Sequence, residues 1–91
     1  MVLFAVRIKV GDYAKWKAVF DESEPIRRAA GSTGVNHIYR DVDDPNTLTF
    51  MMEWDTADKA RAFMNDPALR ERQQRAGALG APVFSAVLSA A

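Results

Sequence analysis

The chain has 91 residues, which is enough for a single domain over residues 1–91 and too few for two. Its 12 basic and 12 acidic residues give a formal net charge of zero, which argues against a nucleic-acid partner, because such partners require a basic surface. It contains no cysteine, which excludes disulfides, thiolate zinc sites and cysteine nucleophiles. It also has no apolar run long enough to span a membrane. We therefore expect a cytoplasmic protein.

The first strand is expected over residues 2–10, where apolar residues alternate with others. Basic residues interrupt this segment, so it is expected to be a strand and not a signal peptide. Asp12 is placed to cap a helix in which Tyr13, Trp16 and Phe20 share one face.

A break in this first helical region is expected at Pro25, which cannot continue a regular helix. Ser23 or Glu24 could cap a short continuation with the proline in its first turn. The glycine-containing segment 31–34 predicts a stop and a turn, and a second strand is expected over residues 35–41.

A third strand is expected from about residue 47 to residue 54, after a turn-rich hairpin connector at 41–46. The apolar period then changes from two to 3.6, so a helix should begin near Asp55 or Thr56. The Asp66-Pro67 pair predicts that this helix breaks and starts again.

A last strand is expected over residues 82–89 and completes the order β-α-β-β-α-β. That order predicts an α+β, ferredoxin-like fold with an antiparallel four-stranded sheet and both helical regions on one face. The sheet face expected under the helices is strongly apolar and carries Val6, Ile8, Phe50, Met52, Phe84 and Leu88. The opposite face is mixed and carries Arg7, Thr49, Met51, Val83, Ser85 and Val87. Because this second face is too apolar for water, we expect a homodimer through the sheet faces.

Two polar residues in the second strand are candidates for catalysis. His37 is the only histidine, and histidine has an ordinary pKa near neutrality, so it could act as a general base; a structural histidine at a sheet edge or interface is the alternative. Arg40 could bind a substrate carboxylate or enolate, or be a solvated residue at the strand end. Arg7 and Glu53 share a predicted face and are expected to form an ion pair across strands or at the dimer interface.

Large aromatic residues gather on the two helical regions and at one strand end: Tyr13, Trp16, Phe20, Trp54 and Phe63. They could pack the core, and they could equally line a pocket for a flat ligand. We hypothesise a substrate-binding pocket between helices and sheet, walled by these five residues, with His37 or Arg40 supplying the polar contact. The sequence has no zinc motif, phosphate-binding loop or nucleophile–base–acid set, so no metal and no cofactor are expected.

The strand end Glu53-Trp54-Asp55, the helix after it and the segment Asn65-Asp66-Pro67-Ala68-Leu69 resemble a signature of the dimeric α/β-barrel superfamily. The similar branch is the one that includes the antibiotic-biosynthesis monooxygenases, and the resemblance covers nearly the whole chain. It implies a homodimer of two face-to-face sheets, with a pocket between sheet and helices in each subunit. Some members are cofactor-independent oxygenases acting on polycyclic aromatic substrates, and others degrade haem or cyclise polyketides.

The haem-degrading branch has a helical tryptophan, a helical histidine ligand and an asparagine on the first strand. At the corresponding places this chain has Phe63, Gln73 and the pair Ala5-Val6, so the resemblance does not extend to haem degradation. Two function classes stay open: an enzyme acting on an aromatic or polyketide-like substrate without a cofactor, and a non-catalytic dimeric module that binds a small ligand or has a structural role. Turnover that depends on His37 would favour the first, and tight binding without turnover the second.

Overall fold

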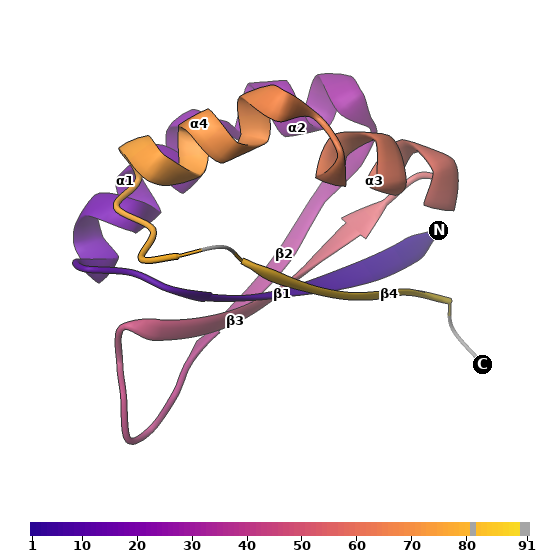
Figure 1. Ribbon diagram of the computed structural model, residues 1–91. Coiled ribbons are helices and arrows are strands. Elements are labelled where there is room, and N and C mark those ends of the chain that lie inside the picture. The colour runs from indigo at the N-terminus through magenta and orange to yellow at the C-terminus, as the bar shows by residue number, and fades with distance from the viewer. Residues whose placement is uncertain (81, 90–91) are drawn as a thin grey trace.

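The computed structural model describes residues 1–80 and 82–89, which form an antiparallel sheet with helices on one of its faces (Figure 1). In chain order the elements are β1 (Val2–Lys9), α1 (Tyr13–Glu22), α2 (Glu24–Ala30), β2 (Ser32–Arg40), β3 (Thr47–Trp54), α3 (Ala57–Met64), α4 (Pro67–Arg75) and β4 (Val83–Ser89). The strand order across the sheet is β2-β3-β1-β4, and neighbouring strands are antiparallel. The predicted ferredoxin-like arrangement is confirmed, with each helical region divided in two.

Short polar residues cap the first turns of α1, α3 and α4. The carboxylate of Asp12 accepts two backbone N–H bonds from the first turn of α1, at 2.9 and 3.4 Å. The hydroxyl of Thr56 accepts one at the start of α3 (3.2 Å), and the carboxylate of Asp66 accepts one at the start of α4 (3.0 Å), whose first residue is Pro67. These bonds satisfy N–H groups that have no partner inside the helix.

The glycine-containing segment after α2 differs from the prediction, because β2 begins at Ser32 and not at residue 35. Gly31 ends α2 with a φ of 127°, and Gly34 adopts a φ of 88° inside the strand. The pairing of β2 with β3 shifts register between Ser32 and Asn36. A bulge of this kind places Gly34 within the strand, so the expected turn is a bent strand start.

The sheet face under the helices forms the core. Buried residues alternate along β1 and β3, in the pattern of strands with one buried face: Phe4, Val6, Ile8, Leu48, Phe50, Met52 and Trp54. They pack with Trp16 of α1 and with Ala60 and Phe63 of α3. The predicted inward positions of Val6 and Phe50 are confirmed.

The last strand departs from simple alternation, because its pairing shifts register opposite the middle of β1. Phe84 and Val87, three residues apart, therefore both pack against the core, whereas Leu88 lies on the open face and is 44% exposed. The predicted sides of Val87 and Leu88 are wrong, because one irregular step reverses the alternation beyond it. Phe84 and Val83 lie on the predicted sides, and Ser85 lies outside the residues whose side chains are described.

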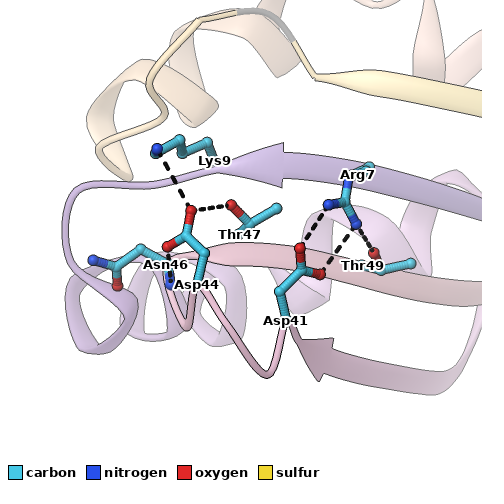
Figure 2. Close-up of polar contacts among 7 residues, drawn as sticks. All are labelled: Arg7, Lys9, Asp41, Asp44, Asn46, Thr47 and Thr49. Carbon is cyan, nitrogen blue, oxygen red and sulfur yellow. Dashed lines mark hydrogen bonds and ion pairs between the residues drawn. The ribbon is translucent and has the colours of Figure 1, made fainter.

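The open face of the sheet carries a polar network around Arg7 (Figure 2). Its guanidinium donates two hydrogen bonds to the carboxylate of Asp41, at 2.6 and 3.1 Å, and one to the hydroxyl of Thr49 at 3.1 Å. The predicted pair of Arg7 and Glu53 does not form across the strands of one subunit, because the strand register places Arg7 opposite Thr49 and Glu53 opposite Leu3. The alternative, an ion pair at a dimer interface, stays a prediction. Glu53 instead accepts a hydrogen bond from the hydroxyl of Thr33 at 2.9 Å.

Asp44 organises the loop between β2 and β3 (Figure 2). Its carboxylate accepts hydrogen bonds from the hydroxyl of Thr47 at 2.7 Å and from the backbone N–H of Asn46 at 3.2 Å, and it lies 3.5 Å from the ammonium of Lys9. These contacts, the Thr47 bond above all, hold the pKa of Asp44 below its ordinary value.

Apolar side chains are also exposed on the open face, where Val35, Tyr39, Val83 and Leu88 lie among polar residues. Within the described part of the chain, no helix has the length and apolar character needed to cross a membrane.

Candidate functional site

A narrow cavity of about 60 Å³ lies between the helices and the sheet. Its aromatic walls come from four elements: Trp16 and Phe20 of α1, Phe50 of β3, Phe63 of α3 and Phe84 of β4. The cavity therefore lies in the layer where the sequence predicts a pocket.

The aromatic rings on one side of the cavity support one another. Trp16 and Phe20 stack with ring centroids 4.9 Å apart. Phe50 lies 5.2 Å from the Trp16 ring and meets Phe20 edge-on at 5.6 Å. These are the offset and edge-to-face arrangements that aromatic pairs favour, so the wall is a fixed apolar surface suited to a flat ring.

The most buried polar group of the cavity is the guanidinium of Arg27, a residue of α2 that is only 4% exposed. Its Nη1 donates a hydrogen bond of 2.7 Å to the carbonyl of Phe20, and its guanidinium carbon lies 3.7 Å from the centre of the Phe20 ring. Its Nε is buried without a hydrogen-bond partner. Arg27 thus closes the end of α1 and still has donor capacity left.

Arg72 of α4 lines the same cavity, with its guanidinium carbon 5.5 Å from the centre of the Phe63 ring. Its Nη2 is buried and has no hydrogen-bond partner. Among the described residues, neither Arg72 nor Arg27 forms an ion pair. Burial lowers the pKa of Arg27; the carboxylates of Glu24 and Asp21 oppose this shift, and the charge of Arg72 adds to it.

Three of the five predicted aromatic residues, Trp16, Phe20 and Phe63, line the cavity. Trp54 does not line it: its ring is fully buried in the core, 4.9 Å from Phe63, and its indole N–H has no partner there. Tyr13 does not line the cavity, and its ring centroid lies 6.1 Å from that of Trp16.

The two predicted catalytic residues lie elsewhere. His37 pairs with Met51 in the sheet, so it is on the open face, away from the helices. The guanidinium carbon of Arg40 lies 4.3 Å from the centre of the Tyr13 ring, and its Nε donates a hydrogen bond of 2.7 Å to the carbonyl of Pro45. Neither lines the cavity in this structure, where the polar lining comes from other residues.

The sequence-based prediction of the site did not include the polar side chains that line the cavity, because charged residues on helices usually face solvent. A signal for them exists in the spacing, since Leu69, Arg72, Gln73 and Ala76 follow one helical stripe and all line the cavity. The first helical region has a matching stripe of Trp16, Phe20, Ser23 and Arg27. Within the described residues, no group of three or more His, Cys, Asp or Glu side chains is placed to hold a metal ion.

No protein-family model and no curated protein matches the sequence. Solved structures do match. A candidate antibiotic biosynthesis monooxygenase from Bordetella bronchiseptica superimposes with a TM-score of 0.74 at 19% identity, over 92% of this chain and 91% of its own. A mutant of SnoaB, a cofactor-independent oxygenase from Streptomyces nogalater, gives 0.71 at 20% identity, over 98% and 91%. NE2512 from Nitrosomonas europaea, a protein of unknown function, gives 0.69 at 18% identity, over 99% and 90%.

These identities are low, so the likeness concerns the fold. It extends over nearly the full length of both chains in each comparison, and it agrees with the element order and strand order described above. The chain therefore has the ferredoxin-like α+β fold of the antibiotic biosynthesis monooxygenase structures, as its resemblance to that branch of the dimeric α/β barrels predicts.

Proposed function

We propose that this protein is a small enzyme that binds a flat aromatic or polyketide-like substrate in the cavity between helices and sheet, and acts on it without a metal or organic cofactor. The observation that carries the proposal is the aromatic wall of Trp16, Phe20 and Phe50 beside a few polar groups, the usual composition of a small-molecule site. The fold shared with SnoaB, a cofactor-independent oxygenase, supports the reaction class.

In an oxygenation without a cofactor, the substrate must itself supply the electrons, and an electron-rich enolate or phenolate does so more readily than its neutral form. The protein's contribution is then to bind the substrate as its anion, to orient it and to exclude water. The guanidinium groups of Arg27 and Arg72 are placed to stabilise such an anion, and Gln73 offers a further hydrogen bond.

The cavity is too small for an aromatic ligand in this conformation, because about 60 Å³ is far below the roughly 300–1,000 Å³ of ordinary ligand sites. Arg72 also lines an outer hollow of about 250 Å³ between α2 and α4, together with Ile26 and Glu71. The side chain of Arg72 is therefore a common wall, and its rotation would join the two spaces. Such rotamer changes of partly exposed side chains are fast.

We also propose that two copies associate through their open sheet faces. The exposed apolar residues Val35, Tyr39, Val83 and Leu88 support this, because an apolar sheet face is otherwise left in water. In such a homodimer His37 would lie at or near the interface and not in the cavity.

A non-catalytic ligand-binding module is the second candidate, and one observation favours it. The only histidine lies on the open face, and the polar side chains that line the cavity are Arg27, Arg72, Gln73 and Ser23. None of these is an ordinary general base near neutral pH. If the substrate is acidic enough to ionise by itself, catalysis does not require a general base from the protein.

The experiment compares binding and turnover. Anthrone-like compounds are titrated into metal-free protein while tryptophan fluorescence and oxygen consumption are followed. Because Trp16 lines the cavity and Trp54 does not, we expect Trp16→Phe to remove most of the ligand-dependent quenching and Trp54→Phe to keep it. Oxygen consumption above the protein-free rate supports the enzyme, and quenching without consumption supports the binding module. Equal loss of quenching in both variants would place the ligand elsewhere.

A further inference from the structure

We propose that the cavity selects an anionic aromatic ligand, whose carboxylate, phenolate or enolate oxygens bind between Arg27 and Arg72 while its ring lies along the aromatic wall. This inference deepens the proposed function and rests on it, because it names the charge of the substrate for the same cavity.

The first support is that Arg27 is buried without an ion pair and with an unused hydrogen-bond donor. Arg27 as a whole residue is only 4% exposed, and a buried charge is costly unless it is compensated, yet Arg27 forms no ion pair with the described residues. Its single hydrogen bond, from Nη1 to the carbonyl of Phe20, leaves Nε without a partner. The edge formed by Nε and Nη2 is one that receives a carboxylate through two parallel bonds.

The second support is that Arg72 brings another positive charge to the same apolar space. Its Nη2 is buried without a partner, and its charge disfavours the charged form of Arg27. Two like charges at one cavity repel each other, and an anion between them would remove both the repulsion and the unpaired donors. The pair therefore fits a ligand with negative charge better than a neutral one.

A purely structural role accounts for only part of this arrangement. Arg27 caps the carbonyl end of α1 through Phe20, which is a favourable place for a cation. That role uses one edge of one guanidinium and does not involve Arg72, whose buried Nη2 has no hydrogen-bond partner. A ligand anion explains both arginines together.

Access through Arg72 agrees with this assignment. The outer hollow beside it is also lined by Arg75 and Glu71, so an arriving anion meets Arg72 before it reaches Arg27. The guanidinium would then move with the ligand's charged group, and the same movement would open the cavity.

The test uses two probes of equal shape and different charge, 2-naphthoate and 2-naphthamide, with affinities measured by calorimetry at fixed ionic strength. We expect wild-type protein to bind the naphthoate at least about tenfold more tightly, the effect of one charge-assisted bond. Arg72→Met should remove most of this preference. Arg70→Met is the matched control, since Arg70 is an exposed arginine on the same helix that does not line the cavity, and it should keep the preference.

The outcomes separate the inference from the proposed function. Equal affinities for both probes in wild-type protein would overturn the anion site and leave an aromatic pocket standing. A preference that survives in Arg72→Met and Arg27→Met would overturn it as well. Absence of binding for both probes would overturn the pocket together with the inference. Because Arg27→Met also loses the bond to Phe20, its folding is checked by the unfolding midpoint, and Arg72→Met carries the main comparison.

Discussion

Phe50 gives a direct test of the cavity, because its ring belongs both to the core and to the cavity wall. It is 5% exposed and packs at 5.2 Å against the Trp16 ring. Phe4 is a matched comparison: it is the same residue type on the neighbouring strand, is fully buried, and does not line the cavity. Phe50→Ala and Phe4→Ala therefore differ mainly in whether the lost ring borders empty space.

Truncation of a buried phenylalanine to alanine costs about 3–5 kcal/mol. Phe50 already borders a cavity of about 60 Å³, so part of its surface has no packing partners to lose. We expect Phe50→Ala to lie near the lower limit, about 3 kcal/mol, and Phe4→Ala near the upper limit, about 5 kcal/mol. In a domain of this size, each 1 kcal/mol corresponds to a shift in Tm of about 4–8 °C.

The assay is urea unfolding followed by tryptophan fluorescence. The protein concentration is held fixed, because the stability of a homodimer depends on it. Both substitutions lie under the helices, so neither touches the open sheet face. A loss for Phe50→Ala that equals or exceeds the loss for Phe4→Ala would refute the empty space beside Phe50, and with it the pocket. A change in the dependence on urea would show that the variants are no longer comparable.

The charged groups and the open face lead to three further expectations. Arg72→Met should stabilise the protein by about 1 kcal/mol in thermal unfolding. The substitution removes an unpaired buried N–H, which costs about 1–3 kcal/mol, and the repulsion with Arg27, and it loses only the contact with the Phe63 ring, about 0.5–1 kcal/mol. A lower Tm would contradict this prediction. Met51→Asp should weaken the proposed homodimer, because an unpaired carboxylate at a dry interface is costly, and an unchanged mass in light scattering would contradict the assignment of the face. The pKa of Asp44 is lower in the folded protein than its ordinary value, so its carboxylate contributes stability above about pH 4 that is lost as the pH falls through the folded pKa. Asp44→Asn should therefore make unfolding midpoints less dependent on pH below about pH 4, and an identical pH dependence would show that these contacts are absent in solution.

Local chemistry explains which parts of the fold were predictable. The caps Asp12, Thr56 and Asp66 act on backbone groups within three residues of themselves, so their effect is written in adjacent sequence. The sides of Val87 and Leu88 could not be read in this way, because they depend on a register shift between two strands that are far apart in sequence. Alternation fixes which residues share a face within a regular strand, and it cannot locate a bulge set by the partner strand.

The same distinction applies to the candidate site: features set by local sequence were predicted, and features set by distant elements were not. Aromatic residues at helical spacing predict an apolar layer, and Trp16, Phe20 and Phe63 do lie along the cavity. A pattern of apolar residues by itself gives no reason to place an arginine inward. The one signal for Arg72 is its place at helical spacing between Leu69 and Ala76, which line the cavity with it. His37 shows the converse limit: its face is fixed by pairing with Met51, which the sequence of β2 alone does not specify.

The two faces of the sheet divide the chemistry of this chain. On the open face, the two basic residues of β1 are paired with carboxylates, Arg7 with Asp41 and Lys9 with Asp44, which suits a surface that another copy can cover (Figure 2). The face under the helices differs, because Arg27 and Arg72 lie beside an aromatic wall and form no ion pair among the described residues. A protein under selection only for stability would gain by pairing or replacing these cations. Their position at a cavity agrees with the proposed site for an anionic ring. Because the proposed dimer surface and the cavity lie on opposite faces of the sheet, substitutions can alter association and binding separately.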